Sequence, residues 1–309
     1  MKLFGHTPPT TAWIGLTIVT VNLVVAVFGP LIAPFTESQS VGGTWDVGIV
    51  EVAIHNGFTV LWNHVAALWG GAPGDFLDYP AEHVWLGTDQ IGRDMLTRLI
   101  FGARMTIGVA LVTTVLSFVI GITLGFLAAV VGGWVDIVLS RLVDVVLSIP
   151  LLIFALIILG VFGSSIPVLV LTLGILDSTR VFRLSRALGM NLTVLEYVEA
   201  ARLRGEGIAW IMRREILPNA SAPLFSEFGL RFCFNFLFVA ALSFLGLGIQ
   251  PPYADWGGMV RDNAAAISFG MLAPIWPAIA ISLLTIGVNL VVDWFLSIEA
   301  RPSGAQAEM

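Results

Sequence analysis

The 309-residue sequence predicts an all-α membrane protein with six transmembrane helices, and three observations lead to this fold class. Hydrophobic residues make up 57% of the chain and charged residues 12%, about half the charged share of an average soluble domain. The hydrophobic residues come in long uninterrupted runs rather than in one-sided or alternating patterns. The arginines gather in one segment past the middle of the chain, which orients the runs in a membrane.

The apolar runs define the expected spans, because a bilayer core about 30 Å thick needs about 20 apolar residues in a helix. The first run, residues 12–33, is longer than the apolar part of a signal peptide, so we interpret it as a retained transmembrane helix. The later runs predict five further spans, near 106–131, two within 137–188, and one each near 224–247 and 272–296.

Glycine and proline mark features inside these runs. The stretch "FGSSIP" at 162–167 predicts a turn between the third and fourth spans, and Pro150 is expected to kink the third. Gly121 and Gly125 stand four residues apart in "GITLG", a pattern at which membrane helices approach each other closely. We therefore expect another helix to pack against the second span at this point.

Arginine placement sets the orientation of the spans. Seven of the fourteen arginines lie from Arg180 to Arg214, whereas residues 35–97 contain only Arg93 and eight acidic residues. Basic residues favour the cytoplasmic side, so with six spans both termini are predicted to be cytoplasmic. The chain then divides into a tail with the first span (1–35), an external segment (36–104), a five-helix core (105–298) that includes a helical cytoplasmic loop between spans four and five (190–220), and a cytoplasmic tail (299–309).

The external segment is too long and too charged for a simple turn. Its residues 58–71, "FTVLWNHVAALWGG", predict a short tryptophan-rich helix in the membrane interface, and the sequence identifies no role for the insertion at 36–80. His55, His64 and His83 also lie here, but their spacings of 9 and 19 residues match no compact metal site. We expect no bound metal.

A polar, arginine-rich segment, "EYVEAARLRGEGIAWIMRREILPNASAP", interrupts the apolar sequence at 196–223. Residues 191–204 predict a short helix. Thr193 and Glu196 fit a capping box at its start, and Gly205 permits the left-handed backbone that ends a helix.

A second short helix is expected after this glycine, and Pro218 predicts that it ends near Leu217. Its apolar positions share one side and are Ile208, Ile211, Met212 and Ile216. In the first helix, Ala200 and Ala201 leave room for another surface to approach. A solvated loop whose arginines only set the topology is the alternative. The order helix, glycine, helix favours docking against a cytoplasmic partner.

The sequence lacks the residues that several classes of function require. The only lysine is Lys2, so the chain has no phosphate-binding loop of the G-x-x-x-x-G-K-[ST] type, and any ATP hydrolysis belongs to another subunit. A net charge of −6 argues against nucleic acid as a partner. The single cysteine, Cys233, offers neither a disulfide nor a ligand cluster, and no histidine follows His83. We expect neither an enzyme nor a cofactor in this chain.

Three sequence blocks carry a resemblance to a known family. "EAARLRG" (199–205) followed by "LP" (217–218) resembles the E-A-A-x-x-x-G…I-x-L-P loop of permease subunits in ATP-binding cassette importers, with Glu215 at the usual isoleucine position. "HVWLGTDQIGRDMLTRLIFGAR" (83–104) and "SFLGLGIQPPYADWGGMV" (243–260) resemble the C-type permease subunits of the dipeptide, oligopeptide and nickel importers.

The resemblance implies a permease of the inner membrane that moves peptides or a related small solute by alternating access. It also implies the partners: a homologous sister permease, two ATP-binding subunits that hold ATP and Mg²⁺, an extracytoplasmic substrate-binding protein, and membrane lipid. By the same resemblance, the loop contacts an ATP-binding subunit through residues carried over from the motif, namely Glu199, Ala200, Ala201, Arg202, Arg204, Gly205, Leu217 and Pro218.

An ion-coupled secondary transporter is the alternative function, since such proteins place ionisable residues within the membrane. Asp144 and Asp177 are the candidate residues. The simpler interpretation is ion pairing along the helix, for example of Asp144 with Arg141 and of Asp177 with Arg180. The substrate of an importer is left open among di- and oligopeptides, nickel chelates, opines and glycosides.

Overall fold

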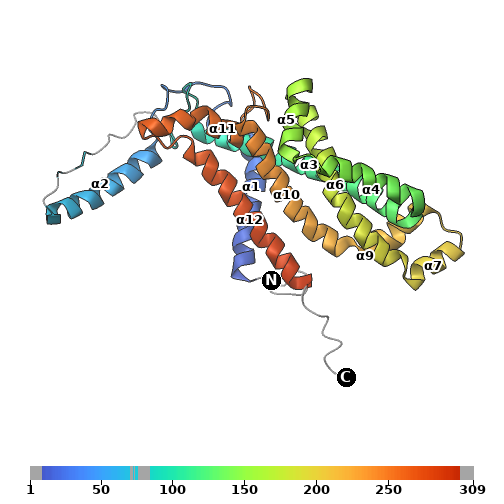
Figure 1. The fold of residues 1–309 in the computed structure, drawn as a ribbon. Coiled ribbons are helices and arrows are strands. Elements are labelled where there is room, and N and C mark those ends of the chain that lie inside the picture. The colour runs from blue at the N-terminus through green and yellow to red at the C-terminus, as the bar shows by residue number, and fades with distance from the viewer. Residues whose placement is uncertain (1–8, 70–71, 73, 76–83, 300–309) are drawn as a thin grey trace. The chain divides into compact units, whose positions relative to one another are not determined.

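The computed structural model describes residues 9–69, 72, 74–75 and 84–299, and within them the chain is all-helical, as predicted (Figure 1). The elements are α1 (Thr10–Ile32), α2 (Ile49–Trp69), α3 (Met95–Val131), α4 (Gly133–Leu147), α5 (Leu151–Phe162), α6 (Ile166–Thr193), α7 (Glu196–Leu203), α8 (Ile208–Trp210), the π-helix η1 (Ile211–Ile216), α9 (Leu217–Asn219), α10 (Ser221–Phe244), α11 (Trp256–Asn263), the 3-10 helix η2 (Ala264–Phe269) and α12 (Ile275–Glu299). The described residues form two compact units, which we call the first unit (9–20, 108–239 and 284–299) and the second unit (21–69, 72, 74–75, 84–107 and 240–283).

Among the described residues, four single helices are long and apolar enough to cross a membrane, and they match the first, second, fifth and sixth predicted spans: α1, α3, α10 and α12. Helix α6 does not reach this level of hydropathy. The third predicted span is the pair α4 and α5. These helices meet at a bend of 84°, far sharper than the kink expected at Pro150, because the helix stops at Leu147 and restarts at Leu151.

Helix α6 stands where the fourth span is predicted, and the predicted turn before it is confirmed by the break between Phe162 and Ile166. This helix carries four charged side chains within its apolar sequence, namely Asp177, Arg180, Arg183 and Arg186. The arrangement of six spans with both termini in the cytoplasm stays a prediction.

Close packing of α3 on α6 organises the first unit, as "GITLG" predicts. A methyl group placed on Gly121 would lie 2.6 Å from the Cβ of Val181, and one on Gly125 would lie 2.7 Å from the Cβ of Ser185. Further along α6, a methyl group on Gly189 would lie 2.7 Å from a side chain of α3. The two backbones therefore touch along several turns, which is the contact that small residues permit between membrane helices.

Ion pairs join α6 to α4 in the same unit. Arg186 donates two hydrogen bonds to the carboxylate of Asp136, and Arg183 Nη2 lies 2.7 Å from Asp144 Oδ1. The expected pairing of Asp144 with Arg141 is therefore wrong. The facing helix brings Arg183 into direct hydrogen-bonding distance, and spacing along one helix cannot reveal such a partner.

The second unit is held by hydrogen bonds between segments far apart in the sequence. Asn263 Oδ1 accepts from Trp45 Nε1 and from the Gln90 amide, both at 3.0 Å. The indole of Trp256, which is fully buried, donates to the carbonyl of Leu99 at 2.9 Å. The blocks 83–104 and 243–260 that carry the family resemblance thus contact each other, although His83 itself lies outside the described residues.

Part of the external insertion forms α2, which begins well before the interfacial helix predicted at 58–71. Its first turn is anchored by Glu51, whose Oε1 accepts a hydrogen bond from the Leu272 amide at 2.9 Å. Phe58, Leu61 and Trp62 are exposed apolar side chains on this helix. A position in the membrane interface stays a prediction. Residues 70–71 and 300–309, on which parts of the sequence predictions fall, lie outside the described residues.

We expect an alanine substitution to affect the glycines of α3 differently, depending on whether another helix packs against them. Gly121→Ala and Gly125→Ala should lower the Tm of the detergent-solubilised protein, because overpacking costs about 1–3 kcal/mol. Gly108→Ala is the control, since no heavy atom lies within 4 Å of its added carbon. Alanine should there raise the stability by about 1 kcal/mol through its helix propensity. Equal Tm values for all three variants would contradict the close packing.

A second prediction concerns Asp255, which is buried and accepts a hydrogen bond from the Gly258 amide at the start of α11. Burial raises the pKa of this carboxyl above its ordinary value, and the hydrogen bond offsets part of the effect. The native state therefore holds the proton more tightly than the unfolded state. The protonated carboxyl therefore favours the native state. This contribution to the free energy of unfolding is complete below the ordinary pKa and is lost as the pH rises through the native pKa.

Asp255→Asn keeps a capping acceptor and does not titrate. We expect the Tm of this variant, relative to the wild type, to rise as the pH is raised from about 4 to 7. Asp255→Ala does not titrate either but lacks the acceptor, so it should be about 1 kcal/mol less stable than Asp255→Asn at every pH. A Tm difference between Asp255→Asn and the wild type that does not change with pH would refute the raised pKa.

Candidate functional site

The candidate site is the segment between α6 and α10, which we call the 194–220 segment. Its first helix, α7, starts at Glu196, and no side chain caps this start. The predicted capping box is wrong. Thr193 is still the last residue of α6, so its hydroxyl donates back to the Met190 carbonyl at 3.0 Å instead of to α7.

The predicted left-handed turn at the end of α7 is confirmed. Gly205 has φ of 81°. The Gly205 amide donates to the Arg202 carbonyl at 2.9 Å, and the Glu206 amide donates to the Ala201 carbonyl at 3.2 Å. This pair of hydrogen bonds is a Schellman motif, which satisfies the last carbonyls of a helix and reverses the chain direction.

The second helix ends at Asn219, two residues past the predicted end near Leu217. Residues 208–219 form a continuous helical stretch, and the Leu217 amide donates to the Met212 carbonyl, five residues earlier, within the π-helix η1. Proline lacks an amide hydrogen and clashes with the carbonyl four residues before it in an α-helix. The wider π turn accommodates Pro218, and the chain continues through a turn at Ala220 into α10.

One face of the segment is buried in a hydrophobic cluster of the first unit. The cluster draws on α3, α7 and the helical stretch after Gly205, and its buried residues are Phe126, Val130, Val198, Ala201, Ile211, Ile216, Ala220 and Leu224. Met212 packs against it, whereas Ile208 is nearly half exposed, so three of the four predicted apolar positions lie in the core. Ala201 is fully buried and holds α7 on α3.

The exposed face carries most of the other motif residues. Glu199, Ala200 and Gly205 are exposed on α7 and its turn, and Leu217 and Pro218 are exposed on the next helix. The sequence reasoning missed an apolar residue on this face, Leu203, whose exposed fraction of 83% is the highest among the large hydrophobic residues of the described chain. Its position between two arginines was the available signal.

The two motif arginines have partners within the chain. Arg202 Nη2 donates at 3.1 Å to the Val130 carbonyl in the last turn of α3, where helix carbonyls lack amide partners. Arg204 lies 3.8 Å from Glu215 Oε1, and its guanidinium lies 5.9 Å from the ring centre of Trp210. Glu215, the departure from the family pattern, therefore ties the helix after Gly205 back to the end of α7.

A protein-family model described as "Binding-protein-dependent transport system inner membrane component" matches residues 121–301, which include the 194–220 segment. The chain belongs to this family. It is a multi-pass permease component of an ATP-binding cassette importer in the inner membrane, and it is a transport subunit rather than a hydrolase.

Relatives with curated names support this assignment over most of the chain. The di/tripeptide transport system permease protein of Pseudomonas aeruginosa is 36% identical over 72% of this chain and 73% of its own length. The dipeptide transport system permease protein of Escherichia coli is 34% identical over 91% and 86%, respectively. The glutathione transport system permease protein of Pectobacterium atrosepticum is 32% identical over 79% and 84%.

Gly205 provides a test of the turn that ends α7. Gly205→Ala should lower the Tm by the equivalent of about 1–2 kcal/mol, because a Cβ in the left-handed region clashes with its own backbone. No other heavy atom lies within 4 Å of the added carbon, so this cost arises from the backbone alone. Gly207→Ala is a matched control with equally open surroundings and φ of −75°, and it should leave the Tm nearly unchanged. Equal losses in both variants would contradict the left-handed requirement.

Proposed function

We propose that this chain is one of two permease subunits of an importer for short peptides. In this proposal it crosses the membrane six times with both termini in the cytoplasm. It pairs with a homologous sister permease and receives substrate from an extracytoplasmic binding protein. Two ATP-binding subunits, which hold ATP and Mg²⁺, drive the cycle. The family match carries the proposal, and the names of the relatives, which specify dipeptides, di- and tripeptides and glutathione, support a peptide substrate.

The 194–220 segment is the proposed coupling element. Its exposed residues Glu199 and Ala200 face away from the buried residues Val198 and Ala201, so α7 presents a polar, small-residue surface on a rigid base. Arg202 fastens this base to the end of α3. A force that an ATP-binding subunit exerts on α7 is therefore transmitted directly to α3, and from α3 to α6 through the contacts at Gly121 and Gly125. Such transfer through packed helices suits alternating access.

Ion coupling has no specific observation in its favour. Asp177 is buried, and its charge is balanced by Arg180 and Arg231, each 3.5 Å from its Oδ1 atom. Asp144 is half exposed and paired with Arg183. A residue that exchanges an ion during transport needs a carboxylate that the ion can reach, and neither aspartate offers one that is both within the fold and unpaired.

The proposal is tested with the complete complex in proteoliposomes, supplied with the binding protein and a labelled dipeptide. Uptake should require ATP. Glu199→Ala should reduce uptake about tenfold or more while ATP hydrolysis continues, because the contact that transmits closure is lost. Glu196→Ala, which removes an exposed glutamate on the same helix, is the matched control and should retain uptake. Uptake that persists without ATP but stops when the proton gradient is dissipated would refute the proposed function.

A further inference from the structure

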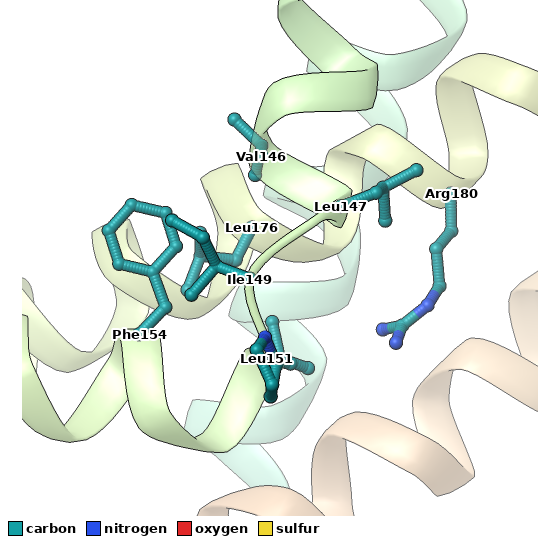
Figure 2. Close-up of a pocket in the computed structure, with 8 residues that line it drawn as sticks. Val146, Leu147, Ile149, Leu151, Phe154, Leu176 and Arg180 are labelled. Atoms are coloured by element: carbon teal, nitrogen blue, oxygen red, sulfur yellow. The ribbon is translucent and has the colours of Figure 1, made fainter.

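A pocket of about 130 Å³ opens at the break between α4 and α5 in the first unit (Figure 2). Most of the residues that line it are apolar by type, among them Leu147, Ile149 and Leu151 around the break, Phe154 of α5 and Leu176 of α6, although polar atoms supply more of the lining surface than apolar atoms do. Arg180 is the one charged residue that lines it. The side chain of Arg180 extends from α6 toward the end of the pocket where Leu151 lies (Figure 2).

The break itself indicates a cavity. Residues 148–150 leave the helix inside what would otherwise be a continuous apolar span, and the two halves diverge by 84°. At membrane depth, non-helical backbone is tolerated only where it is buried in protein or lines a water-filled cavity. Residues 148–150 are exposed in this chain, so the requirement calls for a cavity or a partner beside them, and the pocket opens at this place. Arg180 also lies near the middle of the 28-residue α6, which stands where the fourth span is predicted, and an ionisable side chain inside a membrane-spanning helix would indicate function.

Near the pocket, the side chain of Arg180 is partly exposed, whereas that of its partner Asp177 is buried. Asp177 has an exposed fraction of 1%, and its Oδ2 accepts from Asn235 Nδ2 at 3.1 Å. Arg231 lies 3.5 Å from Asp177 Oδ1 and is also bound to Glu227 at 2.6 Å. Arg180 lies 3.5 Å from the same oxygen, and within the described part of the chain this is its one ion pair.

Arg180 is also oriented and incompletely satisfied. Its guanidinium carbon lies 4.9 Å from the ring centre of Phe234, which supports the guanidinium from one side. Its Nη1 atom is buried, faces Asp177 Oδ1 at 3.5 Å and makes no hydrogen bond to another described residue. About a third of the side chain is exposed, and this residue lines the pocket. The exposed part of the side chain, rather than the buried Nη1, is therefore what an incoming carboxylate can contact from the pocket through charge-assisted hydrogen bonds.

We propose that this pocket is a subsite that binds the free carboxylate of the transported peptide, together with the apolar side chain next to it. The inference rests on the proposed peptide import. A guanidinium matches a carboxylate in a two-pronged geometry, whereas it repels the amino end. A volume of about 130 Å³ is smaller than the roughly 300–1,000 Å³ of sites that enclose a whole ligand, so the pocket receives one end of the peptide.

The test compares alanyl-leucine with alanyl-leucinamide, which lacks the carboxylate charge, in the reconstituted complex. Wild-type uptake should favour the acid. Arg180→Gln should raise the apparent KM for the acid about tenfold or more and leave that for the amide nearly unchanged. The binding protein is the same in every preparation, so a change in the acid-to-amide ratio belongs to the permease.

Arg231→Gln is the matched control, because this arginine contacts the same oxygen of Asp177 but does not line the pocket. The acid-to-amide ratio should stay at the wild-type value in this variant. A ratio that falls equally in Arg231→Gln and Arg180→Gln would overturn the proposal, since it would assign both arginines to the neutralisation of Asp177.

The double variant Asp177→Asn/Arg180→Gln keeps the local net charge. It replaces Arg180→Gln in the experiment if that single variant does not assemble. A wild-type ratio in this double variant would overturn the subsite, and a lost preference for the acid would support it. The two proposals fail differently. Absence of ATP-dependent uptake by the wild type refutes peptide import, whereas normal uptake with an unchanged ratio in Arg180→Gln refutes only the subsite.

Discussion

The backbone contact between α3 and α6 is the constraint on which the first unit depends. Gly121 and Gly125 allow the two helices to touch, and the chain then uses both partners of that contact. The end of α3 supports α7 through the Val130 carbonyl, and α6 carries the charged residues that reach α4. A larger side chain at either glycine would separate α3, which supports the 194–220 segment, from α6, which lines the pocket.

The charged side chains of α6 illustrate how an apolar protein keeps ionisable groups. A buried charge is costly unless a partner and hydrogen bonds compensate it. Asp177 receives two arginines and an asparagine, and the outer arginines of α6 pair with carboxylates of α4. Arg180 differs from these, because its one ion pair within the described residues is to a carboxylate that it shares with Arg231. This difference is the basis of the proposed carboxylate subsite.

The 194–220 segment combines a rigid base with an exposed face. Its base consists of buried apolar residues, the Schellman turn at Gly205 and the bond from Arg202 to α3. Glu215 adds a link to Arg204 that the isoleucine usual at this position cannot form, because isoleucine has no charge. A segment that deformed under load would absorb the motion of a partner instead of transmitting it, so this rigidity suits the proposed coupling role.

The sequence by itself determined the membrane class, the turn before α6, the close approach at Gly121 and Gly125 and the left-handed Gly205, because apolar run length and local sterics decide each of these. Tertiary structure decided the rest. Asp144 pairs with Arg183, which lies 39 positions away, and Arg202 caps α3 at Val130, 72 positions away. The burial of Ala201 depends on a packed surface that includes residues of other helices. The 84° bend at Pro150 and the π turn before Pro218 also escaped prediction. A proline signals only that regular helix is disturbed, and the surrounding packing sets the direction and size of the change.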